Sequence, residues 1–230
     1  ETAWRYMLGV YELLDWFKTH FPNTMIESCS GGGGRFDIGM MQYSTQIWTS
    51  DNTWPHHRSK IQYGTSFAYP ASVMSCHISN PQNICADPDN MHLRFCTSLA
   101  GPLGYEMHLP NASQEIREEI QKQITFYRSV EHIILNGNLH RILSPVNTPY
   151  SAYYFITDDQ SEVLLSFLEI APDVPKKVKL KCTAVKKNKL YMDAATGEQI
   201  SGSCLHEGIL HETSGSGNRG WIKHFLEIKQ

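Results

Sequence analysis

Two stretches of the chain place apolar side chains at the three- to four-residue spacing of an amphipathic helix. The first covers residues 3–20, and Pro22, which cannot continue a helix, marks its end. The second is longer: it begins after Asn111 or Ser113, both suitable N-caps, and ends at Gly137. The pattern therefore predicts one helix at the start of the chain and another near its middle.

Short apolar runs of the kind found in buried strands lie between these helices. We predict strands over residues 24–29, 46–50 and 93–99. A helix is expected after the second strand, with Thr53 as its N-cap. This alternation of strand, loop and helix is the rhythm of βα units, which build parallel sheets. The other segments are assigned as a short helical turn (40–43), as extended or irregular chain (69–77) and as loops (80–90 and 101–104).

The pattern changes near Ser144 and Pro145, where helical spacing gives way to short β-like segments. Their spacing predicts an antiparallel sandwich, so we divide the chain into domains 1–144 and 145–230. The fold class is then α/β followed by all-β. A closed (β/α)8 barrel needs about 250 residues, so the first domain could supply only its last two or three units. The predicted strands of the second domain cover residues 152–157, 162–168, 178–182, 189–192 and 221–228.

Composition excludes several classes of partner. The formal net charge of −3 gives no reason to expect nucleic acid or a membrane surface, and no apolar run approaches the length of a transmembrane span. The chain opens at Glu1, without Met and inside a helix, which leads us to expect that it is a piece of a longer protein. We expect a cytoplasmic location, with secretion left open because an upstream signal could be missing.

Neither the cysteines nor the histidines suggest a metal site. The six cysteines are widely spaced, without a C-x-x-C pair, and are predicted to be reduced thiols. His56 and His57 are adjacent, so their side chains diverge on a helix. We therefore expect no metal site at these residues.

The four glycines at 31–34 are the most unusual feature of the sequence. Glycine is kept where the backbone takes up positive φ or approaches another group closely. The run lacks the Lys-Ser/Thr of a P-loop and the G-x-G-x-x-G fingerprint, which disfavours nucleotide binding. A wall for a neutral polar ligand, lined by peptide groups and by the small Cys29 side chain, fits better.

A carboxylate at the end of the second predicted strand is the candidate for chemistry. Asp51 suits a general acid or nucleophile at the carboxyl end of a barrel strand, although it could also be an N-cap of the helix that follows. Trp48, three residues earlier, could stack on a sugar ring or fill the core. Both alternatives stay open at this point.

Lysines are concentrated between residues 176 and 189, where seven of the fourteen positions are Lys. Their alternation with apolar residues is that of a strand with one solvated face. We interpret the segment as an edge strand protected by lysine rather than as a nucleic-acid patch.

Several motifs in one order resemble the α-galactosidases of glycoside hydrolase family 36. The resemblance runs from about residue 7 to residue 170 and thins out beyond. The motifs are Glu27-Ser-Cys-Ser-Gly-Gly-Gly-Gly-Arg-Phe-Asp37, Trp48-Thr-Ser-Asp-Asn52, Lys60-Ile-Gln-Tyr-Gly-Thr-Ser66, Tyr69-Pro70, Leu103-Gly-Tyr-Glu106, Gln123-Ile-Thr-Phe-Tyr127 and Leu143-Ser-Pro145.

The resemblance implies a fold and a set of site residues. The chain would hold the last part of a (β/α)8 barrel and the C-terminal antiparallel β-sandwich. Asp51 would be the general acid/base, Cys29 and Gly32 would line the galactose site, and Trp48 is a weaker substrate-binding candidate. Asn52 stands where many members carry a second Asp.

The family's nucleophile, an aspartate in a Lys-Trp-Asp motif, has no counterpart in this sequence. Retaining glycosidases need two carboxylates, and Asp51 matches only the acid/base. Asp37, the nearest other candidate, matches a non-catalytic position. We therefore expect the chain alone to be inactive.

For the intact protein, the resemblance implies hydrolysis of terminal α-1,6-linked galactose in sugars such as melibiose and raffinose. It implies no metal and no organic cofactor. A galactosyl transferase of the raffinose or stachyose synthase type is the alternative within the family. A non-catalytic carbohydrate-binding role for residues 145–230 is another, although Tyr153, Phe155 and Phe167 fit core packing better than a binding row. For the intact protein we also expect a homo-oligomer, a dimer or a tetramer.

Overall fold

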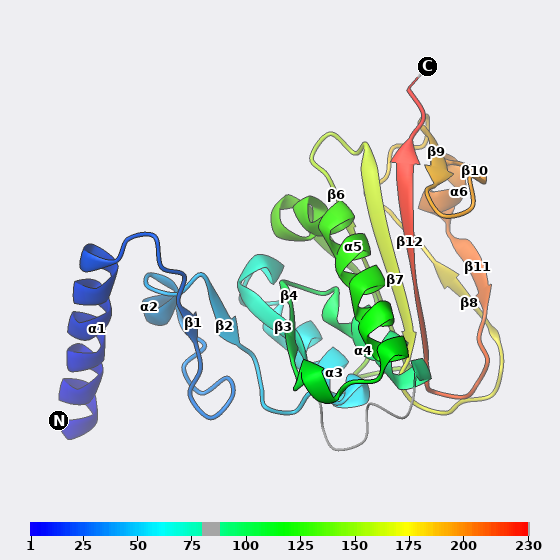
Figure 1. Cartoon of the computed structure of the whole chain (residues 1–230). Helices are drawn as coiled ribbons and strands as arrows, with labels where there is room; N and C mark the ends of the chain where they lie inside the picture. The colour runs from blue at the N-terminus through cyan, green and yellow to red at the C-terminus, as the bar shows by residue number, and fades with distance from the viewer. Residues whose placement is uncertain (80–87, 230) are drawn as a thin grey trace.

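The computed structural model describes residues 1–79 and 88–229, and its first half is built on a four-stranded parallel sheet. Its strands lie in chain order, each pairing in parallel with the next (Figure 1). They are β1 (Glu27–Ser28), β2 (Gln46–Trp48), β3 (Met74–Ser79) and β4 (Leu103–Glu106). The connections contain α2 (Ile38–Met41), α3 (Pro55–Thr65), the 3-10 helix η1 (Ala71–Val73) and α4 (Pro88–Ser98). Repeated strand–helix units of this kind confirm the predicted α/β character.

The N-terminal helix α1 (Thr2–His20) lies at one end of the molecule beside α2, and none of its residues is buried (Figure 1). It contacts the α2 region through Lys18 Nζ, which donates to the Gln42 carbonyl oxygen at 2.6 Å, and through Tyr11, which stacks on Tyr43. The predicted helix over residues 3–20 is confirmed. Its large apolar side chains, among them Trp4, Leu13 and Trp16, remain exposed to solvent in this structure.

The second half is a six-stranded antiparallel sheet in the order β10-β9-β12-β7-β6-β5. A separate two-stranded sheet, β11-β8, packs against it. The strands are β5 (Asn138–Leu143), β6 (Tyr150–Ile156), β7 (Glu162–Glu169), β8 (Lys177–Leu180), β9 (Leu190–Asp193), β10 (Gln199–Ser201), β11 (Ile209–Glu212) and β12 (Arg219–Glu227), with the short helix α6 (Gly202–Glu207) before β11. Within the part of the chain that the structure describes, the lysine-rich β8 pairs with β11 alone, in agreement with the predicted edge strand.

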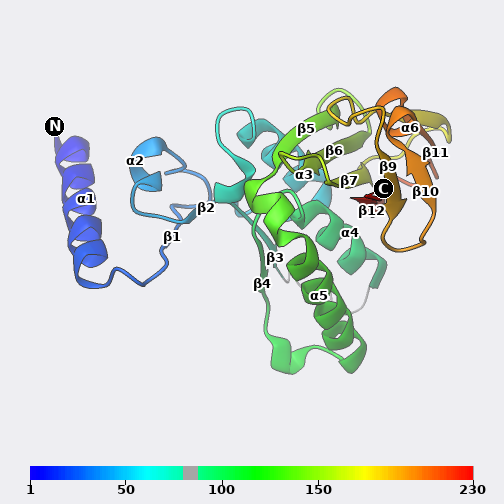
Figure 2. The same cartoon turned by 90° about the horizontal axis from the view of Figure 1, so that it is seen from above.

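A layer of helices lies between the two large sheets. The long helix α5 (Gln114–Asn136) contacts both β6 and β7, and α4 contacts β7 and β12 (Figure 2). One apolar core includes Cys76 and Ile78 of β3, Ile133 of α5, and Tyr153 and Phe155 of β6. The other face of the six-stranded sheet is also covered, so every residue of β6 is buried. The aromatic side chains of the second half therefore fill the core, as expected for Tyr153, Phe155 and Phe167.

The predicted strand over residues 93–99 is wrong, because this segment lies in α4. The helix is buried on two sides: Met91 and Phe95 pack in the core shared with α5, whereas Leu93 and Cys96 pack against Leu168 of β7. Burial on two sides produces an apolar run without the polar face that identifies a surface helix. The predicted loop over 80–90 lies outside the described residues for 80–87, and the remainder opens α4.

Two strands were missed next to glycines. The predicted loop at 101–104 overlaps β4, which completes the parallel sheet. Strand β5 begins directly after Gly137, so the six-stranded sheet starts before the predicted domain boundary near residue 145. That boundary stays a prediction. Strands β10 and β11 and helix α6 were not anticipated either.

The helix caps were predicted only in part. Ser113 Oγ accepts a hydrogen bond from the Ile116 amide at 3.3 Å and caps α5, as expected. The N-cap of α3 is Trp54 rather than Thr53, and it makes no side-chain capping bond. Thr53 instead shares a hydrogen bond with Ser79 of β3, so it links two neighbouring strand ends.

No helix among residues 1–79 and 88–229 is long and apolar enough to cross a bilayer. The cysteines in the same ranges are free thiols, as predicted: Cys29, Cys76, Cys96, Cys182 and Cys204. The sixth, Cys85, lies outside the described residues.

Candidate active site

Asp51 lies in the loop that joins the carboxyl end of β2 to α3. Its Oδ1 accepts a hydrogen bond from the indole Nε1–H of Trp48 at 2.9 Å. The side chain is otherwise exposed, and it does not cap α3, whose N-cap is Trp54. The structure therefore rules out the N-cap alternative for Asp51 and leaves its carboxylate open to a ligand.

The glycine run lies directly beside this loop. Gly31 and Gly32 have φ values of +53° and +79°, which side chains with a Cβ rarely adopt. A Cβ at Gly32 would lie 3.0 Å from the Asp51 amide nitrogen and 3.1 Å from Ser50 Cα. A Cβ at Gly33 would collide with the Thr49 carbonyl oxygen. Both reasons for the glycines given above, positive φ and close approach, hold here.

The four residues singled out from the sequence thus lie together. Cys29 is exposed, and its thiol approaches the Gly32 carbonyl oxygen, with 3.9 Å between Sγ and O. Gly32 touches the backbone of Asp51, and Asp51 accepts from Trp48. Neither the sugar-binding role of Cys29 and Gly32 nor the catalytic role of Asp51 is tested by this geometry, so both stay predictions.

Trp48 does not present its ring to a ligand. Only 5% of the residue is exposed. The Arg58 guanidinium lies 4.3 Å from the ring centroid, and the His77 ring lies 5.2 Å away at an angle of 41°. Burial favours the core-filling alternative over sugar stacking. What Trp48 offers the site is the hydrogen bond that orients Asp51.

Arg58 of α3, which the sequence did not single out, holds this arrangement together. It is 2% exposed, and its guanidinium donates to the carbonyl oxygens of Ser50 and Ser75 and to Gln62 Oε1. Burial lowers the pKa of Arg58 below its usual range, while Glu106, Asp51 and Glu27 favour its charged form. The same group therefore fixes both the Trp48 ring and the peptide just before Asp51. No local sequence signal distinguishes Arg58 from an ordinary helical arginine.

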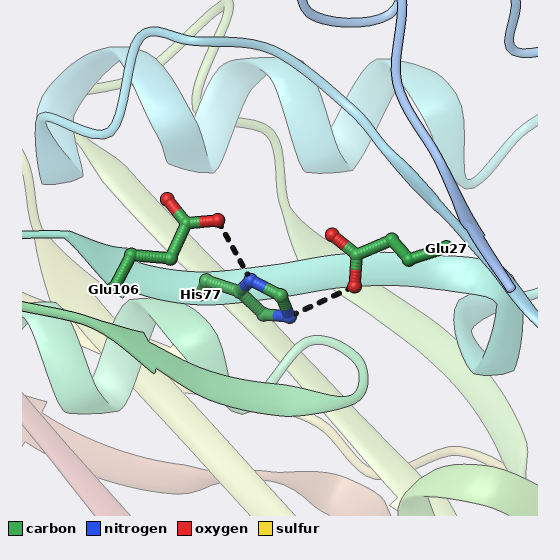
Figure 3. Close-up of side chains that lie close together, drawn as sticks. All are labelled: Glu27, His77 and Glu106. Atoms are coloured by element: carbon green, nitrogen blue, oxygen red, sulfur yellow. Dashed lines mark hydrogen bonds and ion pairs between the residues drawn. The ribbon is translucent and has the colours of Figure 1, made fainter. Parts of the chain in front are cut away.

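A polar network crosses the parallel sheet beside Trp48 (Figure 3). His77 Nδ1 lies 3.1 Å from Glu106 Oε1, and its Nε2 lies 3.4 Å from Glu27 Oε2. Cys76 and Ile78 point into the core with the helices, so His77, between them, faces the opposite side of the sheet. Gln46 donates to Glu27 as well. The network joins β1, β2, β3 and β4 on the face that also carries Trp48.

Glu27, His77 and Glu106 offer one ligand atom each within 4.8 Å of one another, the one such group among residues 1–79 and 88–229. Both imidazole nitrogens already lie within hydrogen-bond distance of a carboxylate. A metal would have to displace one of these contacts. We interpret the group as a polar network of side chains that are satisfied by one another and assign no metal to it.

Asp37, the other nearby aspartate of the motif, has a structural task. Its Oδ1 accepts a hydrogen bond from the Met40 amide at 2.9 Å and caps α2. An aspartate at an N-cap is a common stabilising feature of helices. We therefore assign Asp37 a structural role and do not propose it as the second catalytic carboxylate.

Comparison with known proteins adds to this geometry. A family model described as Melibiase matches residues 1–137. The bifunctional α-galactosidase/sucrose kinase AgaSK of Mediterraneibacter gnavus is 36% identical over 210 residues, which are 90% of this chain and 22% of that protein. The α-galactosidase AgaA of Geobacillus stearothermophilus is 35% identical over 211 residues, or 91% of this chain and 29% of that protein.

Solved structures agree closely with the fold. The galactosidase domain of AgaSK superposes with a TM-score of 0.90 at 34% identity, covering 98% of this chain and 32% of that one. A variant of AgaA in complex with raffinose gives a TM-score of 0.90 at 32% identity, covering 99% of this chain and 32% of that one. The chain thus spans 22% to 32% of the length of these relatives.

Proposed function

The chain belongs to the melibiase family, within glycoside hydrolase family 36, and from this premise we propose that it is the C-terminal part of a retaining α-galactosidase. On this proposal β1 to β4 and their helices are the last units of a (β/α)8 barrel, and the antiparallel sheets are the C-terminal sandwich. The substrates are α-1,6-galactosides such as melibiose and raffinose, since a structural relative is described in complex with raffinose.

In the proposed reaction, Asp51 acts twice. Its carboxylic acid donates a proton to the glycosidic oxygen while a second carboxylate attacks the anomeric carbon, so the leaving sugar departs as a neutral alcohol. The Asp51 carboxylate then takes a proton from the water that hydrolyses the galactosyl-enzyme. The two inversions at the anomeric carbon retain its configuration, and the acid is regenerated.

One observation carries the proposal: the exposed Asp51 carboxylate is oriented by the buried Trp48 indole at 2.9 Å and lies against Gly32. A general acid must be held in one position and yet remain accessible to substrate. The Cys29 thiol and the peptide groups near Gly32 would bound the galactose beside it.

We propose that none of the described carboxylates near Asp51 serves as the second catalytic carboxylate. The sequence contains no Lys-Trp-Asp motif. Asp37 caps α2, and Glu27 and Glu106 are held by His77. We propose that a segment of the natural protein outside this chain provides the nucleophile.

The test compares the 230-residue chain with the protein at its natural length. We expect the longer protein to release galactose from melibiose and raffinose, and the chain alone to give no turnover of p-nitrophenyl α-galactoside. NMR should detect α-galactose as the first product if configuration is retained. Turnover by the isolated chain would contradict the missing nucleophile, and inactivity of the longer protein on every galactoside would contradict the function. Oligosaccharide products in concentrated acceptor would indicate the transferase alternative.

Substitution of Gly32 should disturb catalysis more than substitution of Gly31. In both positions alanine meets positive φ, but only at Gly32 does its Cβ approach the Asp51 backbone, whereas nothing lies within 4 Å at Gly31. We expect Gly32→Ala to lower kcat about tenfold further than Gly31→Ala, because a shift of about 1 Å in a catalytic group is costly. Galactose release by the natural-length protein, measured for both variants at matched folded fractions, checks this. Equal losses would show that backbone strain alone matters.

A further inference from the structure

A groove lies just past Asp51 in the chain and is formed by residues from both halves of the molecule. The 214–218 part of the β11–β12 connection meets the start of α3, where His56 Nε2 lies 3.0 Å from the Gly217 carbonyl oxygen. The β11–β12 connection and the connection that leads into α3 both run along the lower edge of the molecule in Figure 1. The groove between them has a volume of about 380 Å³ and is lined chiefly by Trp54, His56, Pro172, Ser216 and Asn218.

Trp54 gives this groove a rigid aromatic wall. It is 49% exposed, although its backbone amide donates to Asn52 Oδ1 at 3.2 Å and its carbonyl oxygen accepts from the Arg58 amide at 2.7 Å. The Arg94 guanidinium lies 5.0 Å from the ring centroid. A tryptophan held in place by these contacts loses little entropy when a ligand covers its free surface.

The opposite wall is equally well fixed. The carboxylate of Glu169, which is 2% exposed, accepts hydrogen bonds from the Ser214 amide at 2.8 Å, the Ser214 hydroxyl at 2.8 Å and the Gly215 amide at 3.0 Å. Three donors satisfy this buried charge and tie the loop to β7. The groove is therefore largely formed before any ligand arrives.

The chemistry of the walls indicates the class of ligand. No Asp, Glu, Lys or Arg lines the groove among the residues that the structure describes. An exposed indole beside hydroxyl, amide and imidazole groups suits a neutral molecule with apolar C–H faces and many hydroxyls, which is a sugar ring. A second hollow shares Ser216 and Asn218 with the groove and reaches Trp221. Unlike the groove, it also has charged residues on its walls, among them Glu212 and Arg219. The two hollows together offer space for more than one ring.

We propose that this groove binds the sugar residues on the leaving-group side of the bond that Asp51 protonates, and that Trp54 and Asn218 thereby favour longer oligosaccharides over disaccharides. The inference rests on the proposed function, because it takes Asp51 as the acid. Trp54 is only three residues from Asp51 in the same loop. Three residues of chain span at most about 11 Å, so the groove lies within reach of a sugar chain attached at the reaction centre.

The test measures specificity in the natural-length protein. For Trp54→Ala we expect the ratio of kcat/KM on stachyose to that on melibiose to fall about tenfold, mainly through KM, with a smaller fall for Asn218→Ala. Trp54→Phe should keep most of the ratio, and Leu210→Ala, an exposed apolar residue of β11 outside the groove, serves as the control. An unchanged ratio in both Trp54→Ala and Asn218→Ala overturns the proposal.

Direct binding separates this inference from the proposed function. Stachyose can be titrated by NMR into two natural-length proteins that both carry Asp51→Asn to suppress turnover, one with the wild-type groove and one with Trp54→Ala. Stachyose should bind the protein with the wild-type groove at least about fivefold more tightly than it binds Trp54→Ala. If this difference is found but no galactoside is hydrolysed by the natural-length protein, the groove is supported and the proposed reaction is not. Equal binding by the two proteins overturns the groove.

Discussion

Replacement of Asp51 by asparagine is expected to lower kcat/KM on melibiose by a factor of about 10² to 10⁴, the usual contribution of general acid–base catalysis. Asparagine has nearly the same shape and can still accept the hydrogen bond from Trp48 Nε1, which spans 2.9 Å to Asp51 in the wild type. It cannot donate a proton to the glycosidic oxygen, nor can it deprotonate water. The loss would therefore report on the proton transfer rather than on the position of the side chain.

Two measurements on the natural-length protein sharpen this result. An aryl galactoside with a good leaving group needs little help from an acid, so formation of the galactosyl-enzyme should be largely spared and its hydrolysis should become limiting. Azide needs no general base, so it should restore turnover and give α-galactosyl azide by a second inversion. If azide has no effect and every substrate is slowed alike, Asp51 is not the acid/base.

Asp37→Asn provides the matched control for Asp51→Asn. It makes the same chemical change in the same motif region, but at the N-cap of α2, where asparagine is about as effective as aspartate. We expect near wild-type activity from it. A loss as large as that of Asp51→Asn would indicate that any charge change in this region is harmful.

Replacement of Arg58 by methionine is expected to have the second largest effect. The partly buried carbonyl oxygen of Ser50, the buried carbonyl oxygen of Ser75 and the buried Gln62 side chain would each lose a donor. An unsatisfied buried polar group costs about 1–3 kcal/mol, so the free energy of unfolding should fall by about 3 kcal/mol or more. The folded fraction should also show a lower kcat, because the Trp48 ring and the peptide before Asp51 lose their support.

Arg141→Met is the control that distinguishes the loss of stability from the loss of kcat. Arg141 donates to the Ser66 hydroxyl at 2.9 Å and to the Ser66 carbonyl oxygen, and it packs against Phe67, away from the Asp51 loop. We expect it to destabilise the protein in denaturant titrations without changing kcat per folded molecule. Arg58→Met should change both. If the two variants behave alike, Arg58 has no special role in placing Asp51.

Local chemistry explains which parts of this site could be predicted from the sequence. The glycines at 31–34 were conspicuous because their entropic cost requires positive φ or close approach, and both are present at Gly32. Asp51 was conspicuous as a lone carboxylate at a strand end. Arg58 and His77 were not, because their importance comes from partners on other strands. Contacts with residues that are distant in the chain cannot be recognised from a single sequence.

The same contrast holds for the fold. Segments whose apolar residues recur at helical spacing, such as α1 and α5, were predicted, although only α5 buries that face. Helix α4 is buried on two sides and was mistaken for a strand, because an apolar run alone does not distinguish the two. Strands β4 and β5 follow turns at glycines, and tertiary pairing rather than apolar content makes them strands.

The core that α4 and α5 share with both large sheets couples the unfolding of the two sheets. Side chains from β3, α5 and β6 pack in one cluster, so neither sheet can separate without exposing apolar surface of the other. Local unfolding follows such cooperative units, and hydrogen exchange should report β3 and β6 as members of one. The loop that carries Asp51 leaves β2, the neighbour of β3. The conformational stability of this loop therefore depends in part on packing against the six-stranded sheet, to which we assign no catalytic residue.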